Sequence, residues 1–396
     1  MAISQQIKTQ MEKASWIRRM FTQGKELKKL HGADQVFDFT LGNPVFEPPD
    51  EFKQRLAEVA QDPTPGQHRY MANVGFPTVR ESIARYVSTH QGVDVTADHV
   101  IMTTGAASAL NVVLKAVLDP GDEVIVLAPY FVEYLFYVSN HQGDCRIVET
   151  DEGFNLDLDA IRAALGPRTK ALILNSPNNP TGVVYPAETL ERLAAILKEH
   201  RRDTGRSVYV ISDEPYRRLV YDGVTVPPVL GIFSDGIFCT SHAKDLSIPG
   251  ERIGYIALGP ACDSLTELTN ACAFTIRVLG FVNAPAVMQR TVASLQEASV
   301  DVEKYRSLRD LFYDGITGAG YECVRPQGAF YLFPRTPIAD DVAFVQALME
   351  HRVLTVPGSG FGRPGYFRLA YCVTSDTIER AIPAFRQTFQ EMNGKA

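Results

Sequence analysis

From about residue 98 to residue 258, short apolar runs alternate with amphipathic stretches, which leaves few folds open to the chain. The run VIMTT at 100–104 is typical of a buried strand, and the helical pattern AASALNVVLKAVL that follows it ends at Pro120-Gly121. Further apolar runs lie at 123–129, 171–176, 207–212, 237–242 and 253–258. Strands that alternate with helices pair in parallel through crossover connections, so the pattern predicts an α/β fold with a mostly parallel sheet between helices.

The pattern changes after residue 285, where we expect a smaller α+β unit. A long helical stretch at about 285–315 precedes the short β runs ECVRP and AFYLFP. A helix near 341–351, the segment YFRLAYC and a terminal helix complete the chain. The first 45 residues are too few to fold alone and should pack with this unit. The sequence therefore predicts a large domain at 46–285, and a small domain with an N-terminal arm at 1–45 and 286–396.

The composition is that of an ordinary globular protein, because 45% of the 396 residues are hydrophobic and 21% are charged. The formal net charge of −7 disfavours general binding to nucleic acid or to an anionic membrane. The first twenty residues lack the apolar core of an export signal, and the charge-free stretches are too short or too broken for a membrane helix. The six cysteines form no CxxC and suit neither a zinc site nor a disulfide framework, so we expect a cytoplasmic protein without a bound metal.

Small or polar residues directly follow several of the apolar runs, at the strand ends where open parallel sheets bind ligands. Ala106 and Ala107 follow the first run and begin a helix, where backbone N–H groups can approach an anion. Asn179 lies in the loop SPNNPTG, which two prolines and a glycine make rigid, and Asp213 and Tyr216 lie in SDEPY. Taken singly, each of these positions also fits a plain turn or a helix cap.

Cationic residues fall inside or beside segments that should be buried. Lys244 directly follows an apolar strand in SHAKDLSIPGERIGY, and a buried lysine is rare unless it is paired or chemically used. Arg252 lies eight residues later. Arg368 lies in the β run YFRLAYC, where an unpaired guanidinium is costly, so it should meet a structural carboxylate or the carboxylate of a substrate.

In chain order these residues read GNP…Y…TGA…PYF…NNPTG…DEPY…SHAK…R…R, and this order resembles the class I and II aminotransferases of pyridoxal-phosphate fold type I. The resemblance covers nearly the whole chain. It implies a large domain with a seven-stranded sheet, a smaller α+β domain, and pyridoxal 5′-phosphate as coenzyme. It also implies a homodimer with shared active sites, and a ping-pong exchange of the amino group between an L-amino acid and a 2-oxo acid such as 2-oxoglutarate.

The resemblance gives the chemical steps to Lys244, Asp213 and Tyr216. Lys244 would form the internal aldimine with the coenzyme and, once displaced by the substrate amine, would move the substrate proton as general base and acid. Asp213 would pair with the pyridine nitrogen and keep it protonated, so that the ring withdraws electrons. Tyr216, together with Asn179, would hydrogen-bond the ring phenolate oxygen and lower the pKa of the aldimine.

The other roles implied by the resemblance concern binding. Arg368 would hold the substrate α-carboxylate as a bidentate pair, with the backbone of Gly42 close to it. The remaining coenzyme contacts are Phe131 on the ring face and, around the phosphate, Ala106, Ala107, Ser241, Arg252 and the Tyr70 of the neighbouring subunit.

Three positions depart from the commonest pattern of the family. Asn43 replaces a frequent acidic residue, and Ala243 replaces a serine that often precedes the lysine. Ala107 stands where an aspartate-specific branch carries a lysine for the side-chain carboxylate of its substrate. Because that lysine is absent, neutral or aromatic amino acids are the expected donors.

Three alternative functions remain open at this stage. A lyase of the same fold, such as a C–S β-lyase or a cyclopropane-forming synthase, would keep the same lysine, aspartate and tyrosine. A regulator with an aminotransferase-like sensor domain normally carries an N-terminal winged helix, and about 40 residues before GNP are too few for one. A plain nucleotide-binding α/β protein would leave Lys244, Asp213 and Arg368 unexplained.

Overall fold

The computed structural model describes residues 3–13 and 15–393, and its largest element is a seven-stranded sheet in the order β2-β8-β7-β6-β5-β3-β4. These strands are β2 (Val100–Thr103), β3 (Glu123–Ala128), β4 (Asp144–Glu149), β5 (Thr169–Asn175), β6 (Tyr209–Asp213), β7 (Gly236–Ser241) and β8 (Gly254–Leu258). β8 runs antiparallel to both of its neighbours, and the other pairs are parallel. The predicted mostly parallel sheet is confirmed.

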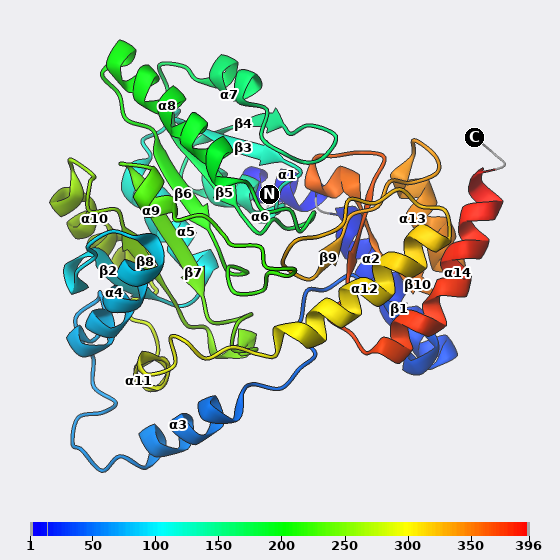
Figure 1. Cartoon of the computed structure of the whole chain (residues 1–396), viewed down its shortest axis with the longest axis horizontal. Coiled ribbons are helices and arrows are strands. Elements are labelled where there is room, and N and C mark those ends of the chain that lie inside the picture. The colour runs from blue at the N-terminus through cyan, green and yellow to red at the C-terminus, as the bar shows by residue number, and fades with distance from the viewer. Residues whose placement is uncertain (1–2, 14, 394–396) are drawn as a thin grey trace.

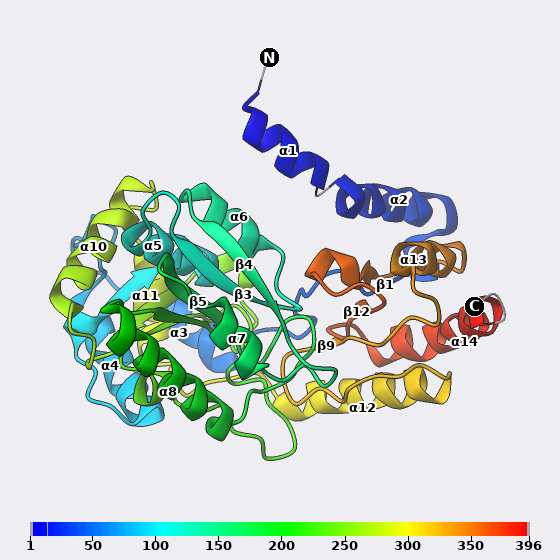
Figure 2. The same ribbon diagram turned by 90° about the horizontal axis from the view of Figure 1, so that it is seen from above.

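Helices cover both faces of this sheet, because each strand points successive apolar side chains to opposite faces. The helices α7 (Leu158–Ala164), α8 (Ala187–Thr204) and α9 (Val229–Ile232) pack on the face that carries Leu172 and Val210. The helices α5 (Ala106–Val117), α6 (Glu133–Asn140) and α10 (Leu265–Val278) pack on the face that carries Ala171 and Ile211. Figure 2 shows α5, α6 and α10 on one side of the strands and α7 and α8 on the other.

A further apolar cluster closes the end of the sheet that contains β2 and β8. It is formed with α3 (Asp50–Gln61), α4 (Pro77–Gln91) and α11 (Ala286–Ala293). The single helix predicted at 285–315 is therefore wrong, because α11 ends at Ala293 and α12 (Val302–Gly318) begins separately. Asp301 causes the new start, since its side chain accepts a hydrogen bond from the Glu303 N–H at 3.1 Å and caps α12.

The second body contains short strands packed against long helices, on the right of Figure 1. Its strands are β1 (Phe37–Asp38), β9 (Tyr331–Leu332), β10 (Val353–Leu354), β11 (Val356–Pro357) and β12 (Phe367–Ala370). Its helices are α2 (Ser15–His31), α12, α13 (Asp341–Glu350) and α14 (Ser375–Asn393). β1 pairs in parallel with β10, whereas β11, β12 and β9 form an antiparallel sheet. The predicted β run ECVRP forms no strand, because the chain from Pro326 onward hydrogen-bonds to loops of the first body instead.

The N-terminal helix α1 (Gln5–Lys13) reaches from α2 to the first body, where Gln6 Nε2 lies 3.0 Å from Ser139 Oγ on α6 (Figure 2). The remaining short elements are the 3-10 turns η1 (Ala33–Gln35), η2 (Ala97–His99), η3 (Pro249–Glu251) and η4 (Gly358–Phe361). Within the described ranges, no helix is long and apolar enough to cross a membrane.

The domain boundaries at 46–285 and at 1–45 with 286–396 remain a proposal. The pairing of β1 with β10 supports the assignment of the N-terminal segment to the small domain. Since α11 packs against α3 and α4, we propose that the large domain extends past 285 into the 294–301 turn. Residues 1–2, 14 and 394–396, which belong to the predicted small domain, lie outside the described residues.

Candidate active site

The carboxyl ends of β5, β6 and β7 open into a cavity of about 340 Å³. The parallel register places Asn175, Asp213 and Cys239 side by side at this edge. Arg368 and Tyr331 reach the same cavity from the small β sheet. The predicted site residues that line it are Gly42, Ala106, Ala107, Phe131, Asn179, Asp213, Tyr216, Ser241, Lys244, Arg252 and Arg368.

Asp213 is the last residue of β6 and has a buried carboxylate, with 5% of the residue exposed. Its Oδ2 accepts a hydrogen bond from Tyr134 Oη at 2.5 Å, whereas its Oδ1 is buried and has no partner among the described residues. Burial raises the pKa of Asp213 to about 7, and the Tyr134 hydrogen bond acts in the opposite direction. A buried carboxylate oxygen without a partner is costly, so this oxygen is suited to a cationic ligand group in the cavity.

Tyr134 was missed by the sequence analysis, which treated the aromatic run YFVEYLFY as helix core. It lies three residues after Phe131 on α6, and the two rings meet edge to face at 5.6 Å between centroids. The signal available in the sequence was a tyrosine one helical turn from the PYF motif. Since Tyr134 holds Asp213 Oδ2, it determines which oxygen of the carboxylate is left for a ligand.

For the transamination that the family resemblance implies, we expect Tyr134→Phe to lower kcat/KM by about tenfold, because the lost hydrogen bond stabilises the ionised Asp213. The pKa of Asp213 should rise, and coenzyme should dissociate more readily as the pH falls. Steady-state kinetics and coenzyme retention on dialysis measure the two effects. Tyr313→Phe is the control, since Tyr313 lies on α12 and does not line the cavity. Equal behaviour of the two variants would remove this role from Tyr134.

Lys244 follows β7 by three residues, and its Nζ donates a hydrogen bond to the carbonyl oxygen of Gly42 at 2.7 Å. The ammonium also lies 5.2 Å from the centroid of the Phe330 ring. Burial lowers the pKa of Lys244 to about 8, and the positive charges of Arg368 and Arg252 act in the same direction. A lysine with such a pKa supplies the neutral amine near physiological pH, which a nucleophile or a base requires.

An anion cradle lies at the start of α5, where Gly105 precedes the helix with a φ of 102°. A Cβ on Gly105 would lie 3.0 Å from Nη2 of Arg252, so only glycine leaves the guanidinium this close to the backbone. Ser241 ends β7 beside it and lines the same cavity. Free N–H groups of a helix N-terminus, a hydroxyl and a guanidinium together suit a phosphate.

Two phenol groups meet on the opposite wall of the cavity. Tyr216 Oη and Tyr331 Oη lie 2.9 Å apart, and both side chains are buried. Burial raises the pKa of Tyr331 to about 12 and raises that of Tyr216 well above its usual value, so both hydroxyls stay protonated. Tyr331, in the run AFYLFP, was not singled out by the sequence analysis, because a tyrosine in an apolar β run is usually a core residue.

Arg368 comes from β12 and is 8% exposed. Its Nη1 donates to Asn179 Oδ1 at 3.0 Å, its Nη2 donates to the Thr40 carbonyl at 2.6 Å, and its Nε is unpartnered. The centroids of the Tyr331 and Phe361 rings each lie 4.7 Å from the guanidinium. Among the described residues, no carboxylate lies within ion-pair distance of Arg368. The sequence predicts either a structural or a substrate carboxylate as its partner, and within the described part of the chain the structural one is excluded.

A chain of polar contacts connects Arg368 to the N-terminal helices. Asp38 Oδ1 accepts hydrogen bonds from both the N–H and the hydroxyl of Thr40, which fixes the carbonyl that holds Arg368. Lys28 on α2 pairs with Asp38 Oδ2 at 2.6 Å. These contacts keep the pKa of Asp38 below its usual value despite burial, so the carboxylate stays ionised.

Tyr70 is the one predicted site residue that does not line the cavity, and it is 90% exposed. Its predicted role involves a neighbouring subunit and stays a prediction. Elsewhere in residues 3–13 and 15–393, no group of three or more His, Cys, Asp or Glu side chains is arranged to hold a metal ion. Lining residues that the sequence analysis did not name as site residues are Leu41, Leu110, Tyr134, Tyr137, Asn175, Pro215, Ala243, Pro249 and Tyr331.

Comparison with known proteins places this cavity in a family. A family model described as aminotransferase class I and II matches residues 34–385. The chain belongs to the class I and II aminotransferases. The aspartate/prephenate aminotransferase of Thermus thermophilus is 37% identical over 369 residues, which cover 91% of this chain and 92% of that protein. The crystal structure of an amino transferase from Eubacterium rectale aligns with a TM-score of 0.95 at 36% identity, over 99% of this chain and 100% of that one.

A second structural relative specifies the fold type of this family member. An aspartate aminotransferase variant from Thermus thermophilus aligns with a TM-score of 0.87 at 33% identity, over 98% of this chain and 100% of that one. The aminotransferase is thus of PLP fold type I, as the sequence predicts, and its family uses pyridoxal phosphate. The site fits this coenzyme, since Asp213 Oδ1 lacks a partner and Arg252 lies over the Gly105 backbone where a phosphate would sit.

Proposed function

We propose that this aminotransferase takes the amino group from neutral or aromatic L-amino acids and passes it to a 2-oxo acid such as 2-oxoglutarate, in a ping-pong cycle. The observation that carries the proposal is the state of Arg368, which is buried, supported on two sides and without a carboxylate partner among the described residues. Amino acids and 2-oxo acids both have a carboxylate beside the reacting carbon. One arginine can therefore serve both half-reactions.

We propose the following roles for the residues that hold the coenzyme and move protons. Pyridoxal phosphate, when bound, accepts the amino group and withdraws electrons from the substrate α-carbon. Asp213 Oδ1 would hold the proton on its ring nitrogen, Phe131 would pack on the ring, and Tyr216 and Asn179 would donate to its ring oxygen. Ala106, Ala107, Ser241 and Arg252 would hold the phosphate.

Lys244 is proposed to take up and return the substrate α-proton through Nζ. Its position supports this role, because Nζ is held at the Gly42 carbonyl on the rim of the cavity and is not bound in an ion pair. Its lowered pKa, about 8, makes the neutral form accessible near neutral pH. The backbone of Gly42 therefore has two proposed tasks, to orient this amine and to lie beside the substrate carboxylate.

The preference for a neutral or aromatic side chain is supported by the lining of the cavity. Beyond Lys244, Arg252 and Arg368, no described lining residue is cationic. Ala107 and Leu110 on α5, Leu41 and Tyr137 leave small or apolar surface where a second carboxylate would need a positive charge. Aspartate is the second candidate donor, because the Thermus thermophilus relative is named an aspartate/prephenate aminotransferase.

We propose a homodimer in which Tyr70 of each subunit reaches the phosphate of the other. The support for this proposal is the exposure of Tyr70, which is 90% exposed within its own chain and so is accessible to a second subunit. We also propose a cytoplasmic location, which agrees with six cysteines that are all free.

A donor screen tests the proposed substrate class. With 2-oxoglutarate and with pyruvate as acceptors, kcat/KM for phenylalanine, tyrosine, leucine and alanine should exceed that for aspartate by about a hundredfold or more. Pyruvate is included because the second carboxylate of 2-oxoglutarate meets no further lining cation. Aspartate as the best donor would contradict the proposal, and release of pyruvate and ammonia without an acceptor would indicate a lyase.

The matched variant for this screen is Ala107→Lys, which adds a cation to the first turn of α5 without touching Lys244 or Asp213. It should raise kcat/KM for aspartate by about tenfold or more while leaving phenylalanine lower. An unchanged ratio of the two donors would show that the side-chain pocket does not lie at Ala107.

A further inference from the structure

Ala329 adopts a left-handed backbone conformation with a φ of 57°, although it is not a glycine. This conformation costs an L-residue about 1–2 kcal/mol, so the surroundings must hold it in place. The next two residues both reach the site. Phe330 lies 5.2 Å from Lys244 Nζ, and Tyr331 Oη lies 2.9 Å from Tyr216 Oη. The backbone at Ala329 therefore determines where the cavity-lining Tyr331 lies and where the Phe330 ring lies against Lys244.

Three hydrogen bonds hold Ala329. Its N–H donates to the Leu219 carbonyl at 2.9 Å, and its carbonyl oxygen accepts from Tyr371 Oη at 3.1 Å and from Tyr221 Oη. Both phenol side chains are buried. Leu219 and Tyr221 belong to the segment that follows Tyr216, so Ala329 is fixed relative to the segment that carries the predicted catalytic tyrosine.

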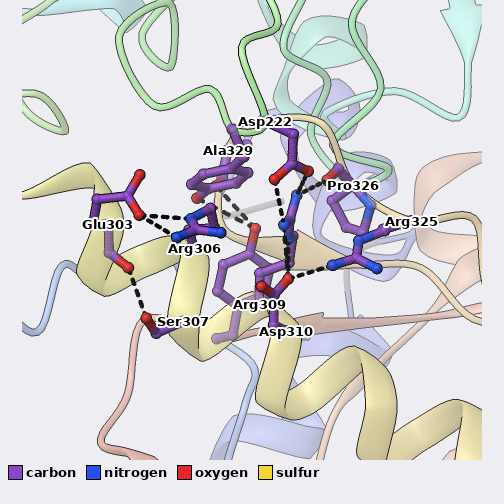
Figure 3. Close-up of polar contacts among 11 residues, drawn as sticks. Asp222, Glu303, Arg306, Ser307, Arg309, Asp310, Arg325, Pro326 and Ala329 are labelled. Atoms are coloured by element: carbon purple, nitrogen blue, oxygen red, sulfur yellow. Dashed lines mark hydrogen bonds and ion pairs between the residues drawn. The ribbon is translucent and has the colours of Figure 1, made fainter.

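Arg309 on α12 holds the other end of that segment (Figure 3). Its fully buried guanidinium donates to Asp222 through Nη1 at 2.6 Å and through Nη2 at 3.1 Å. The guanidinium also lies 4.9 Å from the centroid of the Tyr221 ring. A bidentate pair of this kind fixes orientation as well as distance. Arg309 thus positions both the ring that holds Ala329 and the residue next to it.

One further hydrogen bond of Arg309 reaches the chain that leads to Ala329. Nη1 also donates to the Pro326 carbonyl at 3.0 Å, and Nε donates to Asp310 at 2.8 Å. From there Gln327 and Gly328 donate their N–H groups to the Gly182 carbonyl, each at 2.9 Å, in the loop that carries Asn179. Arg309 is therefore connected to both segments that carry a proposed ligand of the coenzyme ring oxygen. It reaches the Tyr216 segment through Asp222, and the Asn179 loop through Pro326 and the two residues after it.

We propose that Arg309 is a positioning residue for transamination. It fixes Asp222 and Tyr221, these fix Ala329, and Ala329 sets Phe330 against Lys244 and Tyr331 against Tyr216. Arg309 touches neither the cavity nor its ligands, and the proposal rests on the roles proposed above for Tyr216 and Lys244.

Removal of this guanidinium should leave the chain folded. The Asp222 side chain is 48% exposed and can be hydrated when its partner is lost. A methionine fills most of the volume of the arginine, and the Asp310 side chain is 30% exposed, so neither carboxylate that loses its partner is left fully buried. The variant Arg309→Met therefore separates a role in positioning from a role in folding.

The experiment compares Arg309→Met with Arg306→Met, which removes an arginine three residues earlier on α12. Arg306 pairs with Glu303 and is not hydrogen-bonded to Asp222 or to the chain leading to Ala329 (Figure 3). Three quantities are measured on coenzyme-loaded protein: coenzyme content, the pH midpoint of the visible absorbance of the bound coenzyme, and kcat with KM. The midpoint reports hydrogen bonding to the ring oxygen, which a purely structural role of Arg309 would not change.

In Arg309→Met, with coenzyme content unchanged, we expect the midpoint to rise by about 0.5–1 pH unit and kcat to fall by about tenfold, because Tyr216 loses its alignment. KM should change by less than about threefold, and Arg306→Met should match the wild type. The double variant Tyr221→Phe, Tyr371→Phe removes both donors to Ala329 and should reproduce the shift, also if Arg309→Met does not fold.

A midpoint and a kcat equal to those of the wild type, in either Arg309→Met or the double variant, would overturn the positioning role and leave the proposed function standing. A wild-type protein that binds coenzyme without any transamination would instead contradict the proposed function.

Discussion

Replacement of Lys244 by alanine is expected to lower the transamination rate by at least about 10⁴-fold, because it removes the amine that we propose binds the coenzyme and moves the α-proton. Nothing else in the cavity can replace it. The other lining cations are guanidinium groups, which do not give up a proton at neutral pH. Single-turnover kinetics with phenylalanine and a coenzyme-loaded variant measure the loss.

Two observations accompany this variant. Borohydride should fix the coenzyme to the wild-type protein as a secondary amine on the peptide that contains Lys244, and should fix none to Lys244→Ala. Methylamine should restore part of the variant's rate, since it supplies a base in the space that the lysine leaves. Lys53→Ala, on the exposed surface of α3, is the control and should behave as the wild type. Substantial turnover by Lys244→Ala without added amine would refute the assignment.

Asp213→Asn should lower kcat by about a thousandfold or more and, at the same time, stabilise the coenzyme-free protein. The loss of rate follows from the neutral amide, which cannot hold a proton on the ring nitrogen. The gain in stability follows from the pKa of Asp213, which burial raises to about 7 in the folded protein. Between about pH 4 and 7 the folded protein binds a proton that the unfolded chain has released, so this group's contribution to stability falls as the pH rises.

The penalty is fully present above pH 7, where the folded protein holds a buried carboxylate with one unpartnered oxygen. At pH 8 the free energy of unfolding of coenzyme-free Asp213→Asn should therefore exceed that of the wild type by on the order of 2 kcal/mol. The difference should vanish near pH 4, and it should shrink when the coenzyme is bound. Urea unfolding at both pH values measures it. A less stable variant at pH 8 would show that Asp213 is satisfied by the protein alone.

The type of fold and most strands of the large sheet could be predicted from the sequence, because the alternation of apolar runs and helical patterns is a local signal. The strand β4 was missed in that alternation because most of its side chains are exposed or half-buried, so DCRIVE lacks an apolar run. The break between α11 and α12 was missed because Asp301 acts through a cap and not through a change in hydrophobic period.

The site residues that follow apolar strands could likewise be found from sequence position, and all of them line one cavity, namely Ala106, Ala107, Asn179, Asp213, Tyr216 and Lys244. Tyr70, which only the resemblance implies, does not line it. Tyr134 and Tyr331 could not be found in this way. Each is an aromatic residue in an apolar segment, and only the fold brings its hydroxyl to Asp213 or to Tyr216. Arg309 is hidden for the same reason, since its partner Asp222 is 87 residues away in the chain.

The cavity is assembled from two separate sources. Asp213 and Lys244 come from the carboxyl ends of strands in the large sheet. Arg368 comes from β12 in the small sheet and donates a hydrogen bond to the Thr40 carbonyl. The positions that we propose select the substrate side chain, such as Leu41, Ala107 and Leu110, also line the cavity but are separate from these residues. Descendants of this enzyme can therefore change their amino-acid specificity through substitutions at a few loop and helix positions. The residues proposed to bind the coenzyme and move protons need not change.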